Sequence, residues 1–77
     1  MTTQTRIRSE ITGTVWKILA RPGDTLQAED ILMVLESMKM EIPVLAPEAG
    51  RLVELCVAEG APVRDGQELA LFEEASA

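Results

Sequence analysis

Two kinds of side chain in this sequence can form a covalent bond with another group: the lysine amine, which can be acylated, and the cysteine thiol. The chain contains Lys17, Lys39 and Cys56, and it has no histidine, no cysteine pair, no glycine-rich phosphate loop and no cluster of metal-ligand residues. We therefore do not expect an enzyme in its own right. Glu36 and Glu41 are interpreted as the polar residues of a hairpin, not as an acid and base pair.

Lys39 is the stronger candidate because of its surroundings, Glu36-Ser37-Met38-Lys39-Met40-Glu41. The tip of a hairpin normally uses Asn, Asp, Gly or Pro for backbone reasons, and this turn has none of them. Met is flexible and polarizable, and it suits surfaces that several partners contact. Met38 and Met40 therefore predict a lysine presented to other proteins. The alternative is that at least one of the two methionines folds back as core filler.

Cys56 has a plainer interpretation. A single cysteine cannot form an internal disulfide, and without histidine nothing nearby lowers its pKa. Because it lies in an apolar stretch, we expect a small buried hydrophobic residue that reacts with thiol reagents only on unfolding.

On either side of Lys39, the sequence contains two copies of one pattern. Residues 13–36 align with residues 50–73 at a constant offset of 37, with Gly13 on Gly50 and Gly23 on Gly60. Apolar positions match as well, so one supersecondary unit occurs twice, and two units suggest a closed pair related by a pseudo-two-fold axis. Lys39 then lies at a connecting hairpin, and its counterpart, Ser76, lies near the chain end at the opposite pole.

The repeat reads as short strands separated by turns. Arg21-Pro22-Gly23-Asp24 predicts a type II turn, with Pro and Gly at its two central positions. Charges around 5–10 predict an edge strand there, and Pro43 predicts that the segment 41–45 lies at a sheet edge or bends at the proline. The predicted strands are residues 5–10, 14–20, 31–36, 41–45, 51–57 and 68–73.

Length and composition limit the function further. Seventy-seven residues make one domain over 1–77, with an ordered core over about 5–73, and a chain this short buries only about 60% of its unfolded surface. The net charge is −6 and no basic run occurs, so nucleic acid and anionic membranes are not expected partners. No signal core or membrane span is present, so we predict a cytoplasmic protein.

Around Lys39 the chain resembles the biotinyl/lipoyl carrier domain family, most closely biotin carboxyl carrier proteins and small free-standing biotin attachment proteins. The resemblance rests on Met38-Lys39-Met40 within residues 36–44, on Ala46-Pro47 followed by Gly50, and on the turn at Pro22-Gly23-Asp24. It implies an all-β fold: a flattened barrel-sandwich of two four-stranded antiparallel sheets, with the modified lysine at a hairpin tip.

The resemblance also implies a function. A biotin protein ligase joins biotin to Lys39 as an amide, using biotinyl-adenylate, and Met38 and Met40 are flanking residues for ligase recognition or packing. The biotin then moves between a biotin carboxylase and a carboxyltransferase that serves an acceptor such as an acyl-CoA, as in acetyl-CoA carboxylase and fatty acid biosynthesis. The chain would be a non-catalytic carrier subunit.

Two alternatives stay open. The first is lipoate on the same lysine, although lipoyl hairpins usually have Asp before the lysine and Ala after it, and neither is present. The second is an unmodified barrel that only binds proteins.

Overall fold

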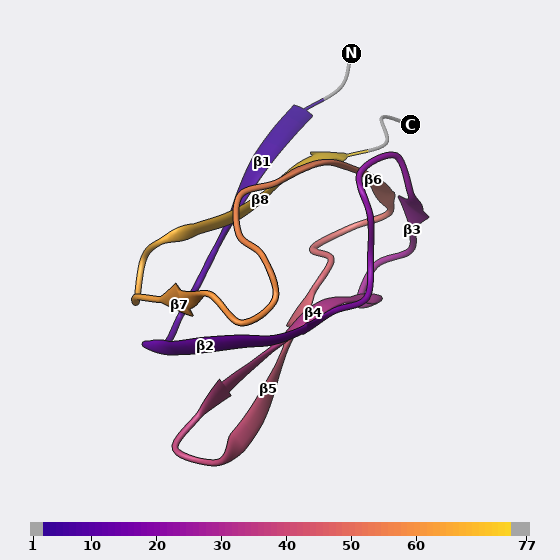
Figure 1. The fold of residues 1–77 in the computed structure, drawn as a ribbon. Helices are drawn as coiled ribbons and strands as arrows, with labels where there is room; N and C mark the ends of the chain where they lie inside the picture. The colour runs from indigo at the N-terminus through magenta and orange to yellow at the C-terminus, as the bar shows by residue number, and fades with distance from the viewer. Residues whose placement is uncertain (1–2, 75–77) are drawn as a thin grey trace.

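The computed structural model describes residues 3–74 as eight strands in two four-stranded sheets (Figure 1). One sheet has the order β1-β8-β6-β3 and the other β5-β4-β2-β7, and every paired neighbour is antiparallel. The predicted fold class is confirmed. The strands are β1 (Thr3–Arg8), β2 (Gly13–Ile18), β3 (Thr25–Leu26), β4 (Ile31–Ser37), β5 (Met40–Leu45), β6 (Gly50–Leu55), β7 (Pro62–Val63) and β8 (Glu68–Glu74).

The predicted repeat governs the whole architecture. Adding 37 to the bounds of β1, β2, β3 and β4 gives the bounds of β5, β6, β7 and β8. The two sheets therefore exchange under one pseudo-two-fold axis. Even the bulges repeat: β2 bulges between Val15 and Lys17, and β6 bulges between Leu52 and Glu54.

The two halves hold each other through their turns. Gly23 has a φ of 96°, and Asp24 N–H donates to the Arg21 carbonyl at 3.0 Å, as the predicted turn requires. Gly23 N–H then donates to the Leu52 carbonyl in the other half, and the equivalent Gly60 N–H donates to the Val15 carbonyl, both at 2.7 Å. Each turn therefore closes the opposite sheet.

The core between the sheets is aliphatic, with Phe72 as the aromatic side chain within it, whereas Trp16 is half exposed. Inward-facing positions alternate along the long strands, so Val15, Met33 and Leu35 are buried while Val34 and Glu36 lie toward the outer face. The stiff sandwich results from this alternation in both sheets.

β1 and β5 are edge strands, as predicted, and Pro43 lies in β5. Strand ends differ from the prediction. β2 stops at Ile18, because Leu19 N–H and Ala20 N–H both donate to the Leu32 carbonyl and interrupt the ladder. β6 stops at the equivalent Leu55, after which Cys56 N–H donates to the Leu69 carbonyl. The two-residue strands β3 and β7 were not among the strands read from the residues.

Cys56 corrects a second expectation. It follows the end of β6 and is exposed, not buried. The neighbouring Leu55 packs against the core, and Leu19, the repeat equivalent of Cys56, is also half exposed. Residues just after these strands face outward by alternation, so an apolar sequence was a poor guide to burial here.

Candidate functional site

The β4–β5 hairpin holds Lys39 at one end of an elongated molecule of about 39 × 18 × 16 Å (Figure 1). Ser37 pairs with Met40, so Met38 and Lys39 form a two-residue loop. The equivalent pair, Thr3 with Glu74, lies at the other end, where β1 begins and β8 ends. The predicted counterpart of Lys39, Ser76, lies outside the described residues.

Both loop residues have left-handed backbones. Met38 has a φ of 51° and Lys39 a φ of 67°, which is the geometry of a type I′ turn. That turn matches the twist of the strands, and it selects Asn-Gly because a residue with a Cβ loses roughly 1–2 kcal/mol in this conformation. Two ordinary side chains held in a sparsely populated backbone region point to a role that outweighs local stability.

The side chains of this turn project into solvent. Met38 is 91% exposed and Met40 is 65% exposed. The alternative that one of them fills the core is therefore wrong. Lys39 is exposed too, and among residues 3–74 no hydrogen bond or ion pair engages its amine. The turn presents an accessible primary amine between two apolar side chains.

The base of the hairpin is braced by the chain entering β2. Ser37 Oγ donates to the Thr12 carbonyl at 3.0 Å. A Cβ built on Gly13 would lie 2.3 Å from the Glu36 carbonyl oxygen, closer than such atoms approach, so this contact requires glycine. The apex is thus mounted on tightly packed backbone.

Two carboxylates face each other below the apex. Glu36 on β4 pairs directly with Glu41 on β5, and like charges in this position repel. None of the ion pairs among residues 3–74 includes either of them. In the other half, the equivalent Glu73 faces Gln4 and binds Arg51 at 3.2 Å. The Glu36–Glu41 pair therefore lacks the basic partner that Arg51 provides for the equivalent Glu73.

Lys17 gives an internal comparison. It is exposed, but it lies within β2 and pairs with Val34 in the middle of a sheet. A lysine on a flat sheet surface enters a partner's active site less deeply than one on a projecting turn. Lys39 is the better placed of the two amines.

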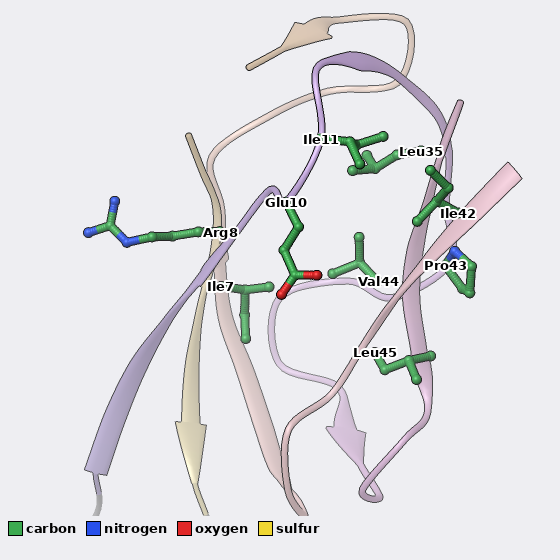
Figure 2. Close-up of a pocket in the computed structure, with 9 residues that line it drawn as sticks. All are labelled: Ile7, Arg8, Glu10, Ile11, Leu35, Ile42, Pro43, Val44 and Leu45. Carbon is green, nitrogen blue, oxygen red and sulfur yellow. The ribbon is translucent and has the colours of Figure 1, made fainter. Parts of the chain in front are cut away.

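A groove of about 380 Å³ lies between the edge strands β1 and β5 (Figure 2). Apolar side chains dominate its lining, the Glu10 carboxylate points into it, and the Arg8 guanidinium points away. No second titratable group faces Glu10 there, so the groove offers no acid and base pair. Among the described residues no group of His, Cys, Asp and Glu could hold a metal ion, and no helix is long and apolar enough to cross a membrane.

The structure and sequence together define the class of protein. Residues 3–72 match the model of a family described as "Biotin-requiring enzyme", and the chain belongs to this biotin/lipoyl family. The predicted resemblance is confirmed. The family is one of carrier domains, and its description agrees with covalently bound biotin as the predicted cofactor.

Individual relatives differ greatly in length. A "Biotinylated protein TB7.3 homolog" from Mycobacterium leprae is 40% identical over 66 residues, which cover 86% of this chain and 93% of that protein. "Urea amidolyase" from Saccharomyces cerevisiae is 34% identical over 67 residues, which cover 87% of this chain but 4% of that protein. The chain thus spans nearly all of one relative and a small part of another.

Among solved structures, a single-chain, multi-domain long-chain acyl-CoA carboxylase superposes with a TM-score of 0.89 and 34% identity. The match covers 96% of this chain and 7% of that one. The shared fold is therefore that of a small module within a much larger enzyme.

Proposed function

We propose that this chain is a biotin carboxyl carrier, a single domain whose biotin is joined through an amide to Lys39. The observation that carries the proposal is the exposed Lys39 amine at the apex of a left-handed turn, in a chain that belongs to a biotin-requiring family. A primary amine free of ion pairs fits acylation, because nothing must be displaced before it reacts.

Attachment requires a biotin protein ligase as the first partner. The Nζ atom of Lys39 forms a bond with the carboxyl carbon of biotin, AMP leaves from biotinyl-adenylate, and the proton of the amine passes to the ligase. Met38 and Met40, both widely exposed, provide apolar surface on either side of the reacting amine. We assign them to ligase recognition.

After attachment, the chain serves the biotin carboxylase and the carboxyltransferase of an acyl-CoA carboxylase. Bound biotin supplies a ring nitrogen that carries a carboxyl group. The β4–β5 strands form a rigid mount, and the methylenes of Lys39 lengthen the arm. Similarity to an acyl-CoA carboxylase module supports this pairing of partners. A cytoplasmic location belongs to the same proposal.

The experiment determines whether Lys39 receives biotin, lipoate or no modification. The protein is produced in cells that contain active biotin and lipoate ligases, with both cofactors supplied, and its intact mass is measured. We expect one biotinyl group per chain and binding to streptavidin. A lipoyl adduct would favour the lipoyl carrier, and an unmodified chain would favour a protein-binding barrel.

A further inference from the structure

The pseudo-two-fold axis provides a control for the outer surfaces of the two sheets. Each outward residue in one sheet has an equivalent residue 37 positions away in the other sheet. The two lie on equivalent strands and have equivalent cross-strand partners. Where the two side chains differ in character, the backbone does not explain the difference. Differences in side-chain character between equivalent positions therefore indicate that the two outer faces contact different surroundings.

The sheet that contains β1 and β8 has a charged outer face. Glu68 pairs with Arg8 across the strands, and it binds Arg6 at 2.8 Å and Arg8 at 3.7 Å. These groups are substantially exposed, so they contribute solubility more than stability. This is the ordinary surface of a small domain.

The equivalent positions on the other sheet are apolar. Ile31 stands where the first sheet has Glu68, Leu45 where it has Arg8, and Pro43 where it has Arg6. Ile31 and Leu45 are cross-strand partners and are each 43% exposed. Trp16, in the bulge of β2, is 50% exposed, where the other half has Val53. We call Trp16, Ile31, Pro43 and Leu45 the apolar face. The exposed Lys17, which pairs with Val34, is the charged residue beside it on β2.

The apolar face is continuous with the lysine hairpin. The pairing of β4 with β5 runs from Ile31 and Leu45, past a bulge between Ile31 and Met33, to the Glu36–Glu41 pair and on to the turn (Figure 1). Glu36 and Glu41, which are in no ion pair among residues 3–74, therefore border the apolar face on its side toward Lys39. A partner that covers this surface needs an apolar centre and a basic residue opposite Glu36 and Glu41.

The size of the face decides between kinds of occupant. Three long strands of at most seven residues cover roughly 300 Å², from about 3.3 Å per residue and about 4.8 Å between strands. A stable interface buries about 800 Å² on each partner. A second copy of this chain would not be held there, whereas a transient partner fits a carrier that must leave after each transfer.

We infer that the apolar face is the docking surface for the biotin carboxylase that acts on the group at Lys39, through an apolar patch and a neighbouring Arg or Lys on that enzyme. The inference rests on the proposed function. It adds that recognition extends along the outer face of one sheet, well beyond the turn, and that the opposite sheet takes no part.

The test introduces the Glu68–Arg8 charged pair at the equivalent positions of the other sheet, Ile31 and Leu45. The double variant Ile31→Glu with Leu45→Arg reproduces the Glu68–Arg8 pair at the same register, so the backbone accommodates it and the net charge is unchanged. The matched control, Glu68→Ile with Arg8→Leu, makes the reverse exchange. Both proteins are biotinylated, checked for folding by circular dichroism, and titrated as substrates of a biotin carboxylase that carboxylates the wild-type protein.

We expect the KM of the double variant Ile31→Glu with Leu45→Arg to rise at least about tenfold with kcat retained, as loss of central apolar contacts predicts. The control should keep the wild-type KM. An unchanged KM in both, or an equal rise in both, would overturn the docking surface. So would sedimentation showing a wild-type dimer that the Ile31→Glu, Leu45→Arg variant disrupts, since a second copy would then cover the face. Wild-type protein without biotin at Lys39 would instead overturn the proposed function itself.

Discussion

Lys39 combines an exposed amine with a backbone conformation that its residue type does not favour. The turn geometry is the usual one for a two-residue hairpin, but the residues that normally relieve it are absent. The residue types of this turn are therefore explained by the chemistry of Lys39 and not by the stability of the fold.

The two lysines allow that separation to be tested. Lys39→Arg keeps the positive charge and the exposed position, but guanidinium does not form the amide, so biotin attachment should be lost entirely with the fold intact. Lys17→Arg should be biotinylated like wild type. Streptavidin blotting reads attachment, and circular dichroism reads the fold. Retained streptavidin binding by the Lys39→Arg protein would disprove the site.

Met38 should show a conflict between stability and recognition. Asn tolerates the left-handed conformation, so Met38→Asn should raise the free energy of unfolding by about 0.5–1 kcal/mol, or roughly 2–8 °C in Tm. The same change removes exposed apolar surface, so the rate of biotinylation should fall.

Met40→Asn is the matched control, because Met40 lies in β5 outside the turn and its φ is not positive. It should bring no gain in Tm. Urea or thermal unfolding measures the change in stability, and single-turnover kinetics measure the rate of biotinylation. A Met38→Asn protein that is no more stable than wild type would contradict the backbone argument.

At the scale of elements, the hairpin depends on the close approach of β2 to β4. Gly13 and Gly50 are equivalent, and a Cβ at either would lie 2.3 Å or 2.2 Å from a backbone carbonyl oxygen of Glu36 or Glu73. The two glycines brace opposite poles, of which only one carries Lys39.

Gly13→Ala and Gly50→Ala should each lower the free energy of unfolding by about 1–3 kcal/mol, as overpacking does. At a temperature where both are folded, Gly13→Ala should be biotinylated more slowly, because the base of the hairpin must shift. Gly50→Ala should keep the wild-type rate. Equal biotinylation rates would show that the brace does not influence the turn.

The exposed Cys56 reverses the expectation of a protected thiol. Native protein should react with a maleimide at a rate comparable to that of urea-unfolded protein, because the side chain already meets solvent. Loss of free thiol over time measures both rates, with Cys56→Ser as the blank. Protection of the native thiol would mean that the residue is covered in solution.

Much of the fold was predictable because specific residues dictate backbone geometry. Gly23 and Pro22 defined a turn, Pro43 placed β5 at an edge, and the repeat of glycines revealed the two-fold arrangement. Two-residue strands were missed because they are too short to show periodicity. The outward direction of Cys56 was missed because apolar type and burial disagree just after a strand ends.

The candidate site was predictable in position but not in conformation. The absence of Asn, Asp, Gly and Pro around Lys39 suggested an unusual turn, and the structure has an ordinary type I′ geometry built from unusual residues. The apolar face had no sequence signal of its own. It emerged only when the pairing register placed Ile31 opposite Leu45 and the symmetry set them against Glu68 and Arg8.

In the whole molecule, the two ends of the elongated, pseudo-symmetric fold carry different features. One pole carries the lysine turn, the Glu36–Glu41 pair and the adjoining apolar face, and the other carries the paired ends of β1 and β8. Acylation of Lys39 would remove one positive charge and take the net charge of the sequence from −6 to one unit more negative. A rigid body with one active end is suited to visiting several enzymes in turn.

The most direct measurement is peptide mapping by tandem mass spectrometry of wild-type protein made with an active biotin ligase. The account predicts one biotinyl group, located on Lys39, with Lys17 unmodified. A biotinyl group on Lys17, a different acyl group on Lys39, or an unmodified Lys39 would contradict it.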